Sequence, residues 1–333
     1  MRKTILIITD NLPTQINGVQ TTFKNIEPHA TKDGYNIVYI DPSQFPHCNA
    51  PLYPEVKLSW PKNIGHLIKS ANANYIHIAT EGPLGLAANM WCWKHKYKFN
   101  TSYHTNFPEF IKKLYGIPES VTYSYVRWFH NHSGKVLTTT QTMVNKLQSH
   151  NFKSNIIPWT RGVDRDKLKP SKQWSHVNSP LIVLYVGRVS KEKNLDALCS
   201  LHDTYTINIV GDGPDKTRLQ KLYPTVNFLG YKSGTQLADH YSQADIFAFP
   251  SKTDTFGIVM IEALSLGTPV AAYPVPGPID IIQHGITGFM HTNLKYAITQ
   301  CTTLDRTTVK NLSHNWSWET TWQIFHDNLI TTT

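Results

Sequence analysis

Residues 246–264 read IFAFPSKTDTFGIVMIEAL, which predicts a strand, a short loop and a helix in that order. The run 246–250 is short and apolar, as in a buried parallel strand. Thr253, Asp254 and Thr255 carry side chains that can cap a helix, and residues 258–266 form an apolar, helix-capable segment. The stretch therefore predicts one repeat of a parallel α/β sheet.

The same stretch places two carboxylates along one helix. Asp254 lies at the predicted helix start and Glu262 lies about two turns later, roughly 12 Å further along the axis. A helix start offers free N–H groups and a positive dipole end to a phosphate. A phosphate site flanked by two carboxylates that each hold sugar hydroxyls would match a nucleotide sugar, in which a diphosphate lies between a ribose and a hexose. The alternative is an amphipathic helix with a capping Asp254 and a solvated Glu262.

Length and composition indicate a two-domain globular protein. The chain has 333 residues, 40% of them hydrophobic and 17% charged, and it contains no apolar run long enough to cross a membrane. Its first ten residues fit a first strand better than a signal peptide, since Asp10 follows a short apolar run. Four widely spaced cysteines form no CxxC pair, which favours a reducing cytoplasm over a disulfide or zinc framework.

The positive charge is concentrated in the first half of the chain. Residues 1–160 hold 16 Lys and Arg against 8 Asp and Glu, a net charge of +8, whereas residues 161–333 hold 16 against 15. Lysines 94, 96 and 98 stand beside Trp91 and Trp93, and Lys112 and Lys113 stand near Tyr115. Such clusters suit an anionic partner such as a membrane surface, although a solvated basic face explains each cluster equally well.

Strand-like runs alternate with helix-length segments throughout, which predicts parallel sheets with crossover helices. We expect strands at 4–9, 36–40, 75–79, 99–104, 135–140 and 155–158, and then at 181–186, 206–210, 226–229, 245–249 and 269–272. A polar divider at 162–180 separates the two series. The predicted domains are 1–162 and 163–310, both doubly wound, with 311–333 as a terminal helix that packs back on the body.

Two further motifs follow predicted strands of the second domain. Gly187 ends the strand 181–186, and Arg188 and Lys193 come next, five residues apart. A glycine lets the backbone approach a ligand, and the two cations can stabilise a departing diphosphate. Gly211 begins a second turn, Gly-Asp-Gly-Pro, after the strand 206–210. The alternative for the Arg188 and Lys193 motif is a solvated basic loop, and the alternative for the Gly211 motif is a plain tight turn.

Polar residues also follow the strands of the first domain. Gly18 lies in the loop after the first strand, where backbone N–H groups can lie under a phosphate. Glu81 and His104 end the next two central strands, and ligands of such sheets bind beyond these ends. Glu81 can hold acceptor hydroxyls. A lone His104 is equally a hydrogen-bonded interior residue.

These motifs resemble, in content and order, the retaining glycosyltransferases of family 4 with the GT-B fold. The signature acid-x-Phe-Gly-x4-Glu matches Asp254, Phe256, Gly257 and Glu262, with Asp in place of the usual Glu. Gly-Arg-x4-Lys, Gly-Asp-Gly-Pro and Arg161-Gly-Val-Asp match further motifs, and His-Thr-x-Phe-Pro-Glu is similar to the subgroup of GDP-mannose-dependent α-mannosyltransferases and glycolipid synthases.

The resemblance implies a GT-B enzyme, two Rossmann-like domains facing across a cleft, that moves a mannose- or glucose-type hexose with retention of configuration. The implied catalytic residues are His104, Arg188, Lys193 and Asp254. The implied donor ligands are Gly18, Arg161, Arg188, Lys193, Gly211, Asp254, Phe256, Gly257, Ile258, Val259 and Glu262. Glu81 and His104 are the implied acceptor residues.

The implied partners are a GDP- or UDP-linked sugar donor and a lipid or glycan acceptor, reached by a cytoplasmic enzyme lying peripherally on the inner membrane face. No cofactor or metal is expected, because Arg188 and Lys193 supply the positive charge, and no nucleic acid is expected. Two alternatives remain open: a nucleotide-sugar 2-epimerase of the same fold, which needs no acceptor, and a non-catalytic nucleotide-sugar-binding protein. A nicotinamide dehydrogenase is disfavoured, because no GxGxxG follows a strand.

Overall fold

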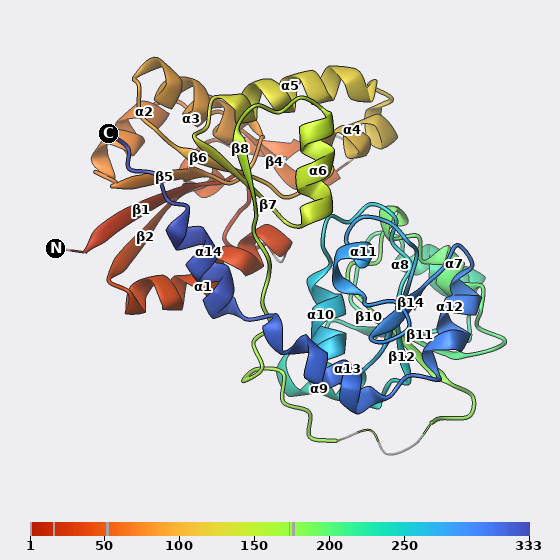
Figure 1. Cartoon of the computed structure of the whole chain (residues 1–333). Coiled ribbons are helices and arrows are strands. Elements are labelled where there is room, and N and C mark those ends of the chain that lie inside the picture. Colours follow the sequence, from red (N-terminus) through yellow and green to blue (C-terminus); the bar gives the residue numbers. More distant parts are fainter. Residues whose placement is uncertain (1, 16, 51–52, 173, 175–176) are drawn as a thin grey trace. The chain divides into compact units, whose positions relative to one another are not determined.

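The computed structural model describes residues 2–15, 17–50, 53–172, 174 and 177–333. The chain divides into two compact units (Figure 1). Unit 1 comprises Met1–Arg161 and Trp318–Thr333, and unit 2 comprises Gly162–Ser317. Each unit contains a six-stranded sheet. No helix among the described residues has the length and apolar character needed to cross a bilayer.

The sheet of unit 1 is parallel throughout, in the order β2-β1-β5-β6-β7-β8. The strand order reverses beside β1, so the carboxyl ends of β1 and β5 form the place where such sheets bind ligands. Its strands are β1 (Lys3–Ile8), β2 (Tyr35–Ile40), β5 (Tyr75–Ile78), β6 (Asn100–Tyr103), β7 (Lys135–Thr138) and β8 (Asn155–Pro158). A separate antiparallel hairpin joins β3 (His47–Ala50) to β4 (Tyr53–Ser59).

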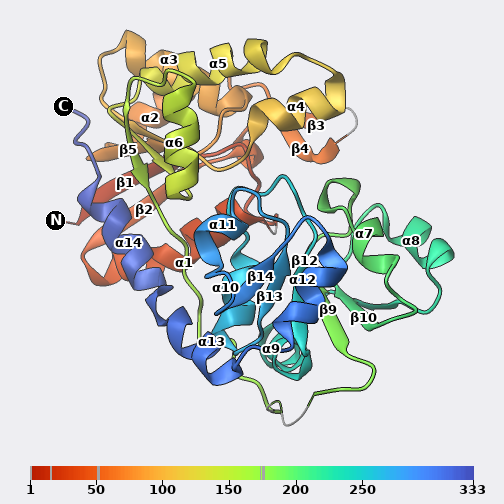
Figure 2. The ribbon, with the colours of Figure 1, turned by 45° about the vertical axis from the view of Figure 1, so that its right-hand side comes forward.

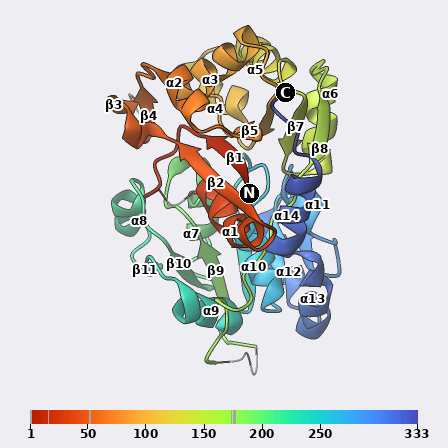
Figure 3. The same ribbon diagram turned by 90° about the vertical axis from the view of Figure 1, so that its left-hand side faces the viewer.

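Helices cover both faces of this sheet, which is why its strands are apolar on both sides. Leu6 and Ile8 of β1 pack with Leu84, Ala88 and the rest of the layer formed by α2, α3 and α5. The opposite face carries α1 and α14, which lie side by side (Figures 1 and 3). The helices of unit 1 are α1 (Gly18–Lys32), η1 (Pro42–Gln44), α2 (Ile64–Ser70), α3 (Pro83–Lys94), α4 (Phe107–Tyr115), α5 (Glu119–Asn131), α6 (Gln141–Ser149) and α14 (Trp318–Asp327).

Unit 2 repeats the design with the strand order β11-β10-β9-β12-β13-β14, again all parallel. Here the order reverses beside β9, between the loops that follow β9 and β12. Its strands are β9 (Ile182–Val186), β10 (Thr206–Val210), β11 (Asn227–Gly230), β12 (Ile246–Phe249), β13 (Val270–Ala272) and β14 (Gly288–Met290).

Two hydrophobic layers cover this second sheet as well (Figure 2). Helices α9, α10 and α13 form one layer, and α7, α8 and α12 form the other. The helices of unit 2 are η2 (Lys191–Lys193), α7 (Asp196–Cys199), α8 (Lys216–Leu222), α9 (Gly234–Gln243), α10 (Ile258–Ser265), α11 (Pro278–Ile281), α12 (Leu294–Cys301), α13 (Arg306–Leu312) and η3 (Ser313–Asn315).

The structure confirms every strand expected from the apolar runs, with boundaries that differ by at most two residues. Two features were not predicted. The β3–β4 hairpin was missed because its first strand, His47–Ala50, is polar and mostly exposed. Strand β14 was missed because it begins with a glycine and contains only two apolar residues in a row.

The final helix α14 belongs to unit 1 although it follows unit 2 in the sequence. Its Trp322 is 2% exposed, and the indole Nε1 donates a hydrogen bond of 2.6 Å to Oδ2 of Asp33, just beyond α1. Phe325 packs against Phe23 of α1 and His77 of β5, with ring centroids 6.1 and 5.0 Å apart. These contacts make α14 part of the core of unit 1.

We expect Trp322→Ala to destabilise unit 1 by about 3–5 kcal/mol, the usual cost of removing a buried tryptophan. Urea denaturation with hydrogen exchange resolved along the chain would measure the loss. Gln323→Ala on the exposed side of the same helix is the control. Equal losses in the two variants, or faster exchange in unit 2 than in unit 1, would contradict this role of α14.

Candidate active site

Two glycine turns at the carboxyl edge of the unit 2 sheet touch backbone to backbone. Gly211 has a φ of +133°, and a Cβ on it would lie 1.9 Å from the carbonyl oxygen of Gly187. The N–H of Gly187 donates to the carbonyl of Val210 at 2.9 Å. Both the space and the backbone conformation therefore require glycine at 211. The turn brings the loop after β10 against the start of the loop that carries Arg188 and Lys193.

Lys193 and Asp254, which lie in different loops, form an ion pair. Nζ of Lys193 lies 2.6 Å from Oδ1 of Asp254, and the two side chains are 22% and 24% exposed. The next residue, Asn194, has a φ of +56°, and its Nδ2 donates to the carbonyl of Pro250 at 3.1 Å. The loop after β9 is thus bonded twice to the loop after β12, and the pair remains accessible to a ligand.

Asp254 has a second carboxylate oxygen, Oδ2, and the backbone of Arg188 in the β9 loop is held by a tyrosine. Oδ2 of Asp254 is buried and has no hydrogen-bond partner among the described residues. The buried hydroxyl of Tyr185 donates to the carbonyl of Arg188 at 2.9 Å. Burial and, to a lesser extent, the charge of Asp254 raise the pKa of Tyr185 well above its usual value, so this hydroxyl stays a donor.

Helix α10 begins with amide groups that no side chain caps. Gly257 precedes it with a φ of +100° and makes no side-chain cap. Phe256 is 4% exposed and packs against Trp316, with ring centroids 5.6 Å apart. This contact anchors the loop between β12 and α10. The first N–H groups, those of Ile258 and Val259, have no partner within a helix of this geometry. They form a binding position for an anion next to Asp254.

Glu262 lies further along α10 and is held by a tyrosine. The hydroxyl of Tyr241, from α9, donates to Oε2 of Glu262 at 2.9 Å. Burial raises the pKa of Glu262, and the Tyr241 hydrogen bond opposes that rise. The structure therefore places all the predicted donor residues from Arg188 to Glu262 on the loops and helix at the carboxyl edge of one sheet.

In unit 1, an aspartate that was not predicted as a site residue lies at the corresponding edge. Oδ1 of Asp10 accepts from the N–H of Leu84 at 2.8 Å, and Oδ2 accepts from Oγ1 of Thr80 at 2.6 Å and from the N–H of Gly85 at 3.3 Å. Asp10 therefore caps α3. Burial raises its pKa to about 6, despite these hydrogen bonds. Its position directly after the first strand was the signal available in the sequence.

His104 ends β6, as predicted, and both of its ring nitrogens have partners. Nε2 lies 2.7 Å from Oγ of Ser102, and Nδ1 lies 2.8 Å from a terminal nitrogen of Arg161. Oγ of Ser102 also lies 2.9 Å from Nε2 of His77. His104 is thus the outer member of a hydrogen-bonded chain that runs into the sheet.

Arg161 lies in unit 1, where it is 3% exposed. Its NH1 nitrogen donates to the carbonyl oxygens of Trp159 and Thr160 at 2.6 and 2.9 Å. The interpretation of Arg161 as a diphosphate ligand gains no support from this geometry, because the guanidinium is buried beside His104. Arg161 is therefore not among the donor residues proposed below.

Glu81 and Gly18 are also bonded within unit 1. Oε1 of Glu81 lies 3.1 Å from Nε2 of His130, and its carbonyl accepts from the hydroxyl of Tyr125 at 2.6 Å. Gly18 begins α1, but Oδ1 of Asn17 caps that helix by accepting from the N–H groups of residues 19 and 20 at 3.1 and 3.0 Å. A phosphate at this helix start would have to displace the Asn17 side chain.

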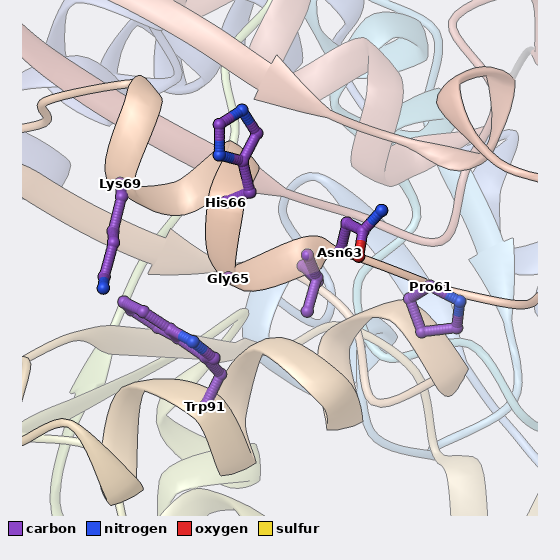
Figure 4. A pocket seen from close by; sticks show the side chains of 7 residues that line it. Pro61, Asn63, Gly65, His66, Lys69 and Trp91 are labelled. Carbon is purple, nitrogen blue, oxygen red and sulfur yellow. The ribbon is translucent and has the colours of Figure 1, made fainter.

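Two hollows on unit 1 contain none of the predicted site residues. The first, about 490 Å³, lies between α2 and α3 and is lined by Pro61, Asn63, Ile64, Gly65, His66, Lys69 and Trp91 (Figure 4). Gly65 lets the Trp91 indole approach α2, since a Cβ would lie 2.1 Å from Nε1. The second, about 780 Å³, is lined by Trp93, Lys94, Lys96, Tyr97, Lys98, Phe99, His132, Ser133, Gly134 and Ile330.

Two family models match consecutive parts of the chain. The model described as Glycosyltransferase Family 4 matches residues 16–167, and the model described as Glycosyl transferases group 1 matches residues 166–294. The first match contains Glu81 and His104, and the second contains every predicted donor residue from Arg188 to Glu262.

Relatives and solved structures agree with these matches. The GDP-mannose-dependent alpha-mannosyltransferase of Corynebacterium glutamicum is 25% identical over 314 residues, which cover 86% of this chain and 76% of that protein. The fold is similar to sucrose-phosphate synthase from Thermosynechococcus elongatus, with a TM-score of 0.76, 17% identity and 98% of both chains covered. Anabaena Alr3699/HepE in complex with UDP gives a TM-score of 0.71 at 16% identity, again over 98% of both chains.

With matched models over 16–294 and two Rossmann-like parallel sheets of the GT-B class, the chain is a member of glycosyltransferase family 4 and a hexosyltransferase.

Proposed function

We propose that the chain transfers a hexose of the mannose or glucose type, with retention of configuration, from a nucleotide-diphosphate sugar to a lipid-linked or glycan acceptor at a membrane surface. The observation that carries this proposal is the contact between Lys193 and Asp254 beside the uncapped start of α10. It combines a cation, a carboxylate and free amides at one place. The GDP-mannose dependence of the Corynebacterium relative favours a GDP-linked mannose as donor.

The donor diphosphate binds between the start of α10 and the cations of the β9 loop. The N–H groups of Ile258 and Val259 and the positive end of the helix attract its oxygens. Arg188 offers a planar fork and Lys193 a compact charge. Glu262, two turns along α10, accepts hydrogen bonds from the ribose hydroxyls.

Asp254 binds the hexose. Its Oδ1 is bonded to Lys193, and its Oδ2 has no partner among the described residues but is buried, so a sugar hydroxyl bonds to Oδ1 in exchange for Lys193 or to Oδ2 after a shift of the loop. The Asp254 side chain is one methylene shorter than the Glu of the family motif, which brings the carboxylate closer to the backbone of its loop. A change in which hexose fits is the consequence we propose for that shorter side chain.

The reaction proceeds by attack of the acceptor hydroxyl on the same face of the sugar that the diphosphate leaves. As the sugar–phosphate bond breaks, negative charge develops on the phosphate, where Arg188 and Lys193 stabilise it. The departing phosphate oxygen takes the proton of the acceptor hydroxyl. Because these two cations neutralise the leaving group, the proposed mechanism needs no metal ion. On unit 1, Glu81 and His104 line the acceptor side.

A basic, aromatic face of unit 1 is the surface that we propose meets anionic lipids. Lys94, Lys96 and Lys98 are exposed and form no ion pair with any described residue, and Trp93 beside them is 62% exposed. By contrast, Lys112 of the second basic cluster is paired with Glu119 at 3.0 Å. The three lysines are therefore the stronger candidate for an enzyme that lies peripherally on the cytoplasmic membrane face.

We expect Lys193→Ala to lower kcat for hexose transfer by about 100- to 1,000-fold, the usual cost of removing one group that stabilises developing charge. Transfer from GDP-mannose and UDP-glucose to a lipid acceptor would be followed by product analysis. Lys191→Ala, which removes an exposed lysine from the same turn, is the matched control. A folded Lys193→Ala enzyme with normal turnover would refute the proposed donor site.

We expect an excess of a chelator to leave the transfer rate unchanged, since the positive charge on the leaving group comes from side chains. Initial rates before and after dialysis against EDTA would test this. A lost activity that returns on addition of Mg²⁺ or Mn²⁺ would contradict the metal-independent mechanism.

We expect replacement of Lys94, Lys96 and Lys98 by Gln to weaken binding to anionic vesicles roughly 100-fold at low salt, from about 1 kcal/mol for each charge. Co-sedimentation with phosphatidylglycerol vesicles, compared with phosphatidylcholine vesicles, would measure it. The matched control replaces three exposed lysines of unit 2, Lys221, Lys295 and Lys310, by Gln. Equal losses in the two triple variants would mean that no particular face binds the membrane.

A further inference from the structure

The tautomer of His104 follows from the chemistry of its neighbour Arg161. A guanidinium can only donate hydrogen bonds, so Nδ1 of His104, 2.8 Å from NH2 of Arg161, must be the unprotonated acceptor. The neutral ring therefore carries its hydrogen on Nε2, from which it donates to Oγ of Ser102 at 2.7 Å. The contact with Arg161 excludes both the other tautomer and the imidazolium.

Arg161 is itself held firmly in this position. Its NH1 donates to the carbonyl oxygens of Trp159 and Thr160, and its guanidinium carbon lies 4.6 Å from the ring centroid of Trp159. Trp159 is fully buried and is fixed in turn, since its Nε1 donates to the carbonyl of Thr321 of α14 at 2.8 Å. The orientation of the guanidinium thus rests on both the end of β8 and α14.

Burial of the Arg161 guanidinium costs free energy of hydration, so we expect the buried charge to have a role. Arg161 is 3% exposed and forms no ion pair with a carboxylate among the described residues. A buried charge without a counterion loses far more hydration energy than two carbonyl hydrogen bonds return. Accordingly, burial lowers the pKa of Arg161 itself to about 9, which still leaves it charged at neutral pH. The side chain it serves at this cost is His104.

The charged groups that act most strongly on His104 oppose its protonation. Among the described residues these are Arg161, His77 of β5 and His130 of α5. Burial first, and then Arg161 and the two histidines, lower the pKa of His104 well below its usual value. The aromatic rings of Phe23 and Trp159 flank it without charge.

We propose that Arg161 is a positioning residue that locks His104 as the neutral tautomer with its hydrogen on Nε2, so that His104 serves the acceptor site as a fixed, uncharged ring and not as a proton-accepting base. This inference rests on the assignment of His104 to the acceptor side of the proposed transferase. It also says where the proton of the acceptor hydroxyl goes. With His104 unable to take it, the proton must go to another group, and the departing phosphate oxygen of the proposed reaction is such a group.

The test reads the tautomer directly, without reference to activity. In protein labelled with ¹⁵N-histidine, two-dimensional NMR distinguishes the two nitrogens of each ring, and His104→Gln identifies the signals of His104. For the wild type we expect a neutral Nε2–H ring from pH 5.5 to 8. In Arg161→Met, we expect the Nδ1–H tautomer to appear beside the Nε2–H form, because no donor then holds Nδ1 unprotonated, while burial still opposes the imidazolium. In Arg161→Lys, which restores one donor and the charge, the wild-type pattern should return.

Arg127→Met is the matched control, because Arg127 of α5 also donates to a backbone carbonyl, that of His150, but does not contact His104. It should leave the His104 signals unchanged. Kinetics add a second readout: kcat of Arg161→Met falls by up to about 100-fold through misplacement of the ring, with KM for the donor unchanged.

A wild-type His104 that titrates near pH 6.5, or that carries its hydrogen on Nδ1, would overturn the proposal even if Arg161→Met does not fold. So would an Arg161→Met protein with an unaltered His104 spectrum. Since the spectra need neither donor nor acceptor, they decide the role of Arg161 separately from the proposed transfer reaction.

Discussion

The ion pair between Lys193 and Asp254 is the contact on which the candidate donor site depends. Parallel strands end at one edge of a sheet, but the loops that follow them are independent of each other until something joins them. Here the Lys193–Asp254 ion pair links the loop after β9 to the loop after β12, and the hydrogen bond from Asn194 to the carbonyl of Pro250 adds a second link. Since an ion pair can release either partner to a ligand, this contact holds the two loops in place and still leaves both groups able to bind.

The two units differ in how the polar groups at the carboxyl ends of their strands are bonded. In unit 2, the strand-end groups include a carboxylate oxygen with no partner among the described residues and a helix start that no side chain caps, so hydrogen-bonding capacity is left for a polar ligand. In unit 1, Asp10, Glu81 and His104 are already bonded to other groups of the unit. A surface whose polar groups are satisfied internally recognises a ligand by shape and weak contacts more than by charge, which is compatible with the acceptor role proposed for this edge of unit 1.

The fold was largely predictable from the sequence, whereas the contacts that give residues their roles were not. Short apolar runs located the strands, because strands buried on both faces must be apolar throughout. Motif positions also located Lys193 and Asp254 separately. Nothing local to Arg161, however, distinguishes a residue that binds phosphate from one that turns inward to His104, 57 positions earlier. The same is true of Glu81 and His130, whose pairing depends on how β5 packs beside α5.

The return of α14 to unit 1 has a consequence for the order in which the chain is built. Unit 2 is a continuous segment, so it has all of its residues before Trp318 is synthesised. Unit 1 is discontinuous, and it lacks Trp322, Phe325 and the carbonyl of Thr321 that anchors Trp159 until residues 318–333 have been synthesised. During synthesis, the second half of the chain can therefore reach its native core before the first half does, which reverses the usual N-terminal-first order of folding.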